Sequence, residues 1–123
     1  MSVERPYEMG MTDVQIVPGA NHVYRVDCFS VPDPARAAFD SAMRRNLAFL
    51  ETLPGFRGHA VLERAGGPGR FNVVTVAAWD SPEAIEEAGG AVRAYYAQIG
   101  FDPPGFLAEW GIAAEIGNFA ALP

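Results

Sequence analysis

Apolar and polar positions divide the 123-residue chain into segments of two kinds. Short segments in which apolar and polar residues alternate, or which are rich in β-branched or aromatic residues, predict strands at residues 22–31, 57–64 and 70–79. The segment at roughly 112–119 is predicted as a fourth strand, although alanine and glycine dilute its pattern. Residues 65–69 are too rich in glycine for a regular element, so the second and third strands are predicted to form a hairpin.

The first predicted strand has one apolar face and one mixed face. A period of two places Tyr24, Val26 and Cys28 on the first of these faces. The second face combines apolar and charged side chains: Val23, Arg25, Asp27 and Phe29. We expect Arg25 and Asp27 to pair with each other or across a dimer, where an exposed ion pair contributes only ~0–1 kcal/mol.

Helical spacing marks two longer segments. In the first, Asp33 and Pro34 are predicted to open a helix that ends at Leu53-Pro54-Gly55, and the apolar stripe is Phe39, Met43, Asn46, Leu47 and Leu50. In the second, Ser81 caps the helix before Pro82, and the stripe is Ile85, Ala88, Val92, Tyr95 and Ile99. We expect Gly89-Gly90 to kink or split this helix. A turn at 102–105 and a further short helix from Phe106 to Trp110 follow.

The predicted order is therefore β-α-β-β-α-β, which is the ferredoxin-like α+β arrangement. It implies a four-stranded antiparallel sheet with helices on one face. We expect the other sheet face to be covered by sheet-to-sheet packing in a homodimer, because an exposed apolar face is unfavourable in water. Residues 1–21 are predicted as an irregular N-terminal arm in which 14–17 form a brief strand at most, and residues 22–123 as one domain.

Charge and composition exclude several kinds of partner and chemistry. The net charge is −6, from fifteen acidic residues and nine arginines, and there is no lysine. A net acidic surface disfavours nucleic acid, and the missing lysine excludes Schiff-base chemistry. A zinc site is not expected from one cysteine and two histidines. The sequence contains no run of about 18 apolar residues, so no membrane span is predicted. No apolar segment of the kind found in a signal peptide is seen either. A single cysteine fits a reducing cytoplasm.

Three local patterns carry a resemblance to a known family. Phe39 lies near the start of the first helix; residues 53–59, LPGFRGH, are similar to a "PGF-G" turn; and residues 79–84, WDSPEA, are similar to a "W-x-S-x-E-A" step. Over residues 22–119 the chain resembles the antibiotic biosynthesis monooxygenase family, whose fold is the dimeric α/β barrel.

The resemblance implies several activities. The family includes cofactor-free oxygenases of polycyclic aromatics, haem-degrading members, quinol oxygenases and members without assigned function. Haem degradation is disfavoured, because those members use a histidine on the second helix and residues 82–99 contain none. We therefore expect a monooxygenase that uses O₂ without a cofactor on a phenolic, polyketide-like aromatic. The alternative is a non-catalytic small-molecule-binding or stress-related protein of the same fold.

Three residues are the candidates for catalysis. Asn46 is predicted to point into the space between helix and sheet, where it either bonds to a strand-end carbonyl or donates from its NH₂ to a substrate oxyanion. Trp79, which lies at or near the pocket in the resembling family, either anchors the second helix or donates from its indole N–H. His59 is either structural or a base near neutral pH.

The candidates for substrate binding are mostly aromatic. Phe39 and Met43 lie on the first helical stripe. Adjacent helical positions differ by about 100°, so one of Tyr95 and Tyr96 should face the core. Phe106 and Trp110, with Phe101, follow a Pro-Pro-Gly turn and are predicted to close the mouth of the pocket.

Overall fold

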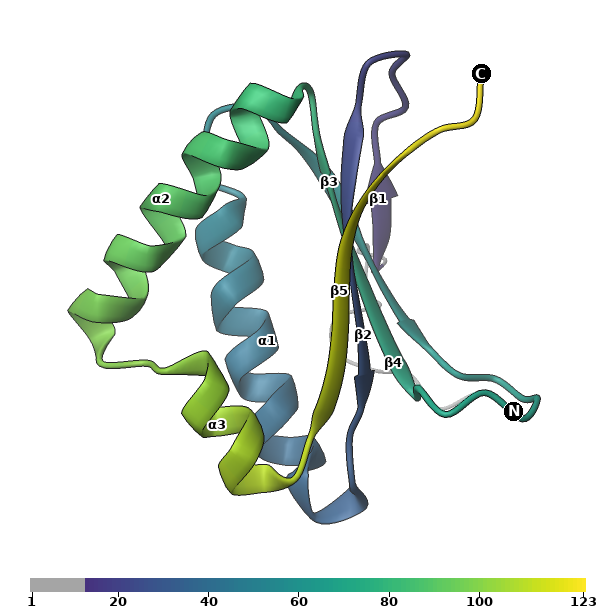
Figure 1. Ribbon diagram of the computed structural model, residues 1–123, viewed down its shortest axis with the longest axis vertical. Helices are drawn as coiled ribbons and strands as arrows, with labels where there is room; N and C mark the ends of the chain where they lie inside the picture. The colour runs from purple at the N-terminus through teal and green to yellow at the C-terminus, as the bar shows by residue number, and fades with distance from the viewer. Residues whose placement is uncertain (1–12) are drawn as a thin grey trace.

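Five antiparallel strands form one sheet in the order β1-β3-β4-β2-β5 (Figure 1). The computed structural model describes residues 13–123. The strands are β1 (Val14–Ile16), β2 (Val23–Ser30), β3 (Phe56–Glu63), β4 (Val73–Trp79) and β5 (Ala113–Ala120). The ferredoxin-like arrangement predicted from the sequence is confirmed in β2 to β5. The sheet has five strands instead of four, because β1 pairs with the outer edge of β3. Residues 1–12 of the predicted arm lie outside the described residues.

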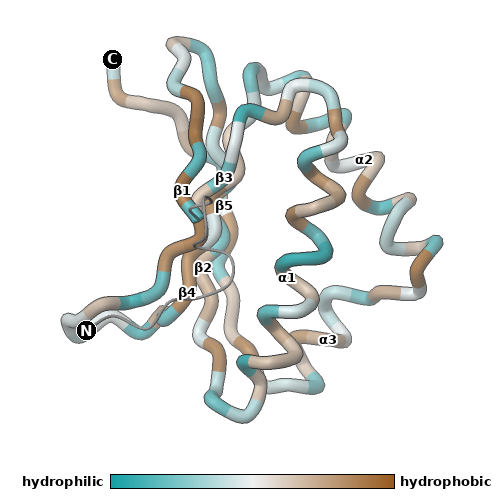
Figure 2. Tube along the Cα trace, turned by 180° about the vertical axis from the view of Figure 1, so that it is seen from behind, coloured by the Kyte–Doolittle hydropathy of each residue, from teal (hydrophilic) through white to brown (hydrophobic). Residues whose placement is uncertain are grey.

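All the helices lie on one side of the sheet, as Figures 1 and 2 show from opposite directions. The helices are α1 (Arg36–Leu50), α2 (Pro82–Ile99) and α3 (Pro103–Trp110), and a short 3₁₀ turn, η2 (Asp33–Ala35), precedes α1. The third helix begins three residues earlier than predicted. None of the helices in residues 13–123 is long and apolar enough to cross a membrane.

The two helix starts differ from each other. Ser81 caps α2 as predicted, because its Oγ accepts a hydrogen bond from the backbone N–H of Ala84 at 3.0 Å. Asp33 does not cap the first helix: Pro32 occupies the N-cap of η2, and no side-chain capping bond forms there. Gly89-Gly90 was predicted to kink or split this helix; the split is wrong, since α2 runs unbroken through both residues.

Strand register decides which side chains lie beneath the helices. Arg25 pairs with Ala77, and Asp27 lies between Thr75 on β4 and Ile116 on β5. Because side chains alternate across a strand, Val23, Arg25, Asp27 and Phe29 of β2 share the helix side. The predicted mixed face is therefore the inner one.

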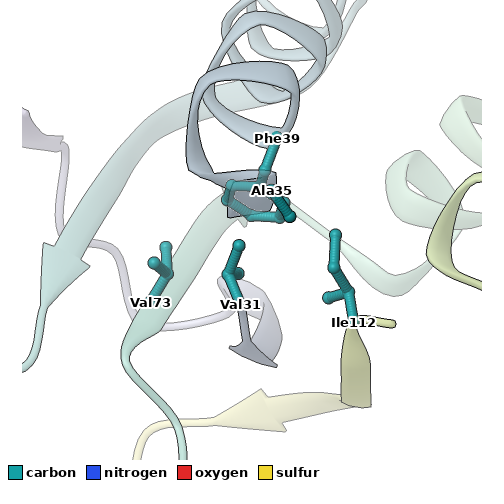
Figure 3. Packing of buried hydrophobic residues seen from close by; sticks show 5 residues of the cluster. All are labelled: Val31, Ala35, Phe39, Val73 and Ile112. Carbon is teal, nitrogen blue, oxygen red and sulfur yellow. The ribbon is translucent and has the colours of Figure 1, made fainter. Parts of the chain in front are cut away.

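Two buried clusters fix the helices to this inner face. One joins Val31, Ala35, Phe39, Val73 and Ile112, whose side chains converge below the first turns of α1 (Figure 3). The other joins Ala77, Trp79 and Ala88 near the start of α2.

The outer face of the sheet carries exposed apolar side chains. Tyr24, Val26 and Cys28 alternate with the inner residues of β2 and therefore face outward. Beside them on this face, Val14 and Phe119 are each 57% exposed and Leu62 is 45% exposed.

Gly58 lets the edge strand β1 approach β3. Its φ is +111°, a conformation that favours glycine, and an added β-carbon would collide with the carbonyl oxygen of Gln15 in β1. The "PGF-G" turn thus ends in a glycine that this close approach requires.

We predict that Gly58→Ala lowers the free energy of unfolding by about 1–3 kcal/mol, because it combines backbone strain with displacement of β1. Gly69→Ala is the control, since its β-carbon would meet no atom within 4 Å and its φ is not positive. Chemical denaturation of both variants measures the difference. Equal stability of Gly58→Ala and the wild type would contradict the prediction.

Candidate active site

A cleft separates the helices from the centre of the sheet. It has two adjoining parts of about 260 and 160 Å³, which share walls from β2, β4, α1 and α2. The wider part extends toward α3 and the narrower part toward the start of α2. Phe39, Met43, Leu47, Leu50 and Val92 give the cleft its apolar walls. This size and lining suit a small aromatic ligand.

Arg25 and Asp27 form an ion pair that both parts of the cleft share. The Nε of Arg25 donates to Oδ1 of Asp27 at 2.7 Å. The side chain of Asp27 is 20% exposed and that of Arg25 is 43% exposed. Burial raises the pKa of Asp27 above its ordinary value, and the charge and hydrogen bond of Arg25 oppose this rise.

This pair leaves hydrogen-bonding atoms unused. Within residues 13–123, Oδ2 of Asp27 accepts no hydrogen bond and neither Nη group of Arg25 donates one. Asp27 can therefore accept from a ligand while Arg25 donates to it. Sequence reasoning paired these residues but assigned them no role. The available signal was their place among apolar residues on one strand face.

Asn46 lines the wider part of the cleft, and within residues 13–123 it bonds to no strand-end carbonyl. Its Oδ1 accepts from Nε of Arg45 at 3.2 Å, and its NH₂ has no partner in the described part of the chain. Arg45 in turn lies 4.4 Å above the ring of Phe101, so this contact connects α1 with the segment before α3. The amide is thus oriented with its donor side free.

Trp79 lies at the opposite end, in the narrower part. Its side chain is deeply buried, at 2% exposure for the residue, and packs edge-to-face on Phe56 with ring centres 5.4 Å apart. Its indole N–H makes no hydrogen bond within residues 13–123. The residue both anchors α2 and lines the cleft, so the two sequence interpretations are compatible.

The two adjacent tyrosines separate as expected. Tyr96 lines both parts of the cleft, and Tyr95 stacks on Phe49 with ring centres 4.1 Å apart. Burial raises the pKa of Tyr96, which keeps its phenol neutral. Tyr96 also packs against Phe101 at 5.1 Å, at the end of the cleft nearest α3.

The remaining candidates divide into two groups. Phe39, Met43 and Phe106 line the wider part of the cleft together with Phe101. Tyr95, Trp110 and His59 do not line either part. His59 is buried on β3, where its Nδ1 lies 3.8 Å from a carboxylate oxygen of Glu51. In residues 13–123, no group of three or more His, Cys, Asp or Glu residues is placed to hold a metal ion.

Solved structures share this fold. SnoaB from Streptomyces nogalater, a cofactor-independent oxygenase, is 30% identical, with 85% of this chain and 96% of that chain covered and a TM-score of 0.61. MhuD from Mycobacterium tuberculosis, a heme-degrader with two hemes bound in its active site, is 22% identical, covering 82% and 96%, with a TM-score of 0.57. A dimeric ferredoxin-like protein from Thermobifida fusca is 17% identical, covering 81% and 91%, with a TM-score of 0.55.

The likeness to MhuD and to the Thermobifida fusca protein shows the fold alone. No family model and no curated protein sequence matches the chain. The fold is therefore that of monooxygenase-like proteins, and the chemistry of this cleft must be argued from its own side chains.

The raised pKa of Asp27 predicts a specific dependence of stability on pH. Because the native state holds this proton more tightly than the unfolded chain, Asp27 lowers the free energy of unfolding as the pH rises from about 4 through its raised pKa. Asp27→Asn removes this cost and keeps an oxygen for Nε of Arg25. We expect the variant to be at least as stable as the wild type at pH 7, with the difference vanishing toward pH 3.

The matched control is Glu63→Gln, which removes an exterior carboxylate bonded to Arg36 over the same 2.7 Å. Glu63→Gln should lower the free energy of unfolding at pH 7 by ~0–1 kcal/mol, whereas Asp27→Asn should leave it unchanged or raise it. Thermal and urea denaturation across pH 3–8 provide the measurement. A loss of several kcal/mol in Asp27→Asn at pH 7 would show that the pair is structural.

Proposed function

We propose that the chain belongs to the antibiotic biosynthesis monooxygenase family and is a cofactor-independent monooxygenase of a phenolic, polyketide-like aromatic. The observation that carries the proposal is an apolar cleft in which several polar atoms of the lining residues make no hydrogen bond in residues 13–123. Asn46, Trp79, Arg25 and Asp27 all line the cleft. Within residues 13–123, the NH₂ of Asn46, the indole N–H of Trp79, Oδ2 of Asp27 and the Nη groups of Arg25 make no hydrogen bond, while Nε of Arg25 bonds to Oδ1 of Asp27. The 30% identity with SnoaB over most of both chains supports this assignment.

The reaction needs only the substrate, O₂ and a proton acceptor. An anthrone-type phenol loses a proton, and the resulting anion passes one electron to O₂. The substrate radical and superoxide then combine in a C–O bond, and the peroxide takes back the proton. Loss of one water gives the quinone, so one oxygen atom enters the product and the other leaves as water.

The cleft would assist this reaction in two ways. Its apolar walls exclude water from the anion, and fixed donors stabilise the charge that develops on oxygen. Asn46 and Trp79 lie in different parts of the cleft, so we assign them to different oxygens of one ring system. His59 is outside the cleft, and Tyr96 is kept neutral by its raised pKa. Neither of these two residues is the proton acceptor that we propose.

We predict that the wild type consumes O₂ with 1,8-dihydroxyanthrone in the absence of flavin and metal. Asn46→Leu should lower turnover about 10²–10³-fold, as the loss of one oxyanion donor does elsewhere. Its stability should hold or rise, because leucine fills space and orphans no buried partner. Oxygen uptake and thermal denaturation measure the two effects.

The control for this substitution is Gln98→Leu, an amide on the exposed side of α2 that does not line the cleft. It should retain wild-type turnover. A destabilised but fully active Asn46→Leu would return Asn46 to a structural role. A wild type that binds the anthrone but consumes no oxygen would favour the alternative, a non-catalytic binding protein of the same fold.

We also propose a homodimer formed through the outer face of the sheet. This face presents Val14, Leu62 and Phe119, which are 45–57% exposed in the single chain. Stable interfaces of this kind commonly bury more than about 2,000 Å² in total.

Light scattering should therefore give about twice the chain mass of 13.2 kDa. Leu62→Asp, which places a charge on the outer face, should shift the protein toward the monomer. Leu122→Asp is the control, because this residue is 94% exposed in the C-terminal tail. A monomeric wild type at micromolar concentration would contradict the dimer.

A further inference from the structure

We infer that Asp27 is the base that removes the hydroxyl proton of the substrate, and that Arg25 holds this carboxylate while binding a second substrate oxygen. The inference rests on the proposed function and makes its substrate more specific. The substrate class is an aromatic or enolic hydroxyl with a carbonyl oxygen close beside it on the same ring system.

The geometry of the pair carries this inference. Two residues apart on β2, Arg25 and Asp27 project to the same side of the sheet and line both parts of the cleft. Nε of Arg25 fixes Oδ1 of Asp27 at 2.7 Å, so the carboxylate is held in one orientation. Oδ2 and the two Nη groups then present an acceptor beside donors, without partners in residues 13–123. A hydroxyl next to a carbonyl offers the complementary donor and acceptor.

A purely structural role explains this arrangement less well. Exposed ion pairs contribute little to stability, and buried charges carry a desolvation cost. Here the pair faces apolar walls that include Phe29, Leu47 and Val92. Placing two charges in these surroundings lowers the stability of the fold. A role of the two charges in binding or catalysis would explain why they are present despite this cost.

The groups around Asp27 leave it as the titrating base. On its own strand the charged neighbour is Arg25, and from α2 the facing titratable group is Tyr96, whose raised pKa keeps it neutral. The side chains that line the cleft from α1, β4 and β5 include Asn46, Thr75 and Ile116, none of which is charged. Arg45 on α1 acts on Tyr96. Burial raises the pKa of Asp27, which makes its carboxylate a stronger base than an exposed one.

The proton step is balanced within the site. The O–H bond of the enol tautomer of the substrate breaks, the proton moves to Oδ2 of Asp27, and the electron pair delocalises onto the ring carbon para to that oxygen, where O₂ then adds. The Nη groups of Arg25 donate to the neighbouring oxygen on the same ring system, which shares the negative charge. Asp27 returns the proton to the peroxide formed with O₂, so the carboxylate is regenerated in each turnover.

The first test is the pH dependence of oxygen uptake with 1,8-dihydroxyanthrone. In the wild type, kcat should rise with pH as Asp27 loses its proton. Asp27→Asn should lower kcat about 10²–10⁴-fold with little change in KM, and the acid limb should disappear. Arg25→Gln should move that limb to higher pH, because the arginine lowers the pKa of Asp27. Glu63→Gln, which removes an exterior carboxylate, should match the wild type.

The second test does not depend on turnover. Bound 1,2-dihydroxyanthraquinone, a ring system of similar size that does not react with O₂, changes its visible absorbance when its phenol ionises. The wild type should bind it as the phenolate at a pH below its free pKa without releasing a proton to the buffer, because Asp27 takes that proton up. Asp27→Asn keeps the Arg25 cation, so any phenolate that it binds should release one proton per ligand.

The outcomes separate the two proposals. An active wild type whose Asp27→Asn variant keeps full turnover and the acid limb would overturn the role of Asp27 and leave the oxygenase intact. A wild type that consumes no oxygen would overturn the oxygenase. In that case, proton release on binding of the anthraquinone would still decide the role of Asp27: the same release by both proteins would refute it.

Discussion

The Arg25–Asp27 ion pair lies in the middle of the inner sheet face, between the two clusters through which the helices pack on the sheet. Arg25 and Asp27 occupy strand positions where a ferredoxin-like core would ordinarily bury apolar side chains, and covering them would carry a large desolvation cost. The helices pack on the sheet at two ends, through the cluster around Phe39 and Val73 and the cluster around Trp79 and Ala88. Between these ends the layers stay apart, and the cleft is the space that results.

The sequence was sufficient to predict the elements whose signals are local. Ser81 caps α2 through a bond within one turn, so its pattern determines its geometry. The pairing of β1 with β3 is non-local: it depends on register and on the backbone of Gly58, which three residues of strand cannot reveal. Gly89-Gly90 disfavours a helix by about 1 kcal/mol per glycine, yet α2 continues because packing of its inner face outweighs that propensity.

The candidate site also contains residues that local sequence patterns could place and residues that only the assembled fold could place. Helical spacing identified Asn46 correctly as a residue facing the space between α1 and the sheet, and one of the two adjacent tyrosines, Tyr96, lines the cleft. Strand alternation put Arg25 and Asp27 on one face, but which face lies under the helices depends on the assembled layers. His59 is a second case in which the sequence could not place a side chain. Its residue type suggested a catalytic base, but the fold puts it beside Glu51, outside the cleft.

The alternation of β2 also connects the two proposed functions of the sheet. Tyr24, Val26 and Cys28 face outward, and each is a direct chain neighbour of Arg25 or Asp27. In the proposed dimer these outer residues pack against a second copy. Strand β2 lies between β4 and β5, which hold its backbone on both edges and so fix the direction in which its inner side chains project. Assembly on one face of the sheet would therefore leave the Arg25–Asp27 pair on the other face, where the single chain already places it.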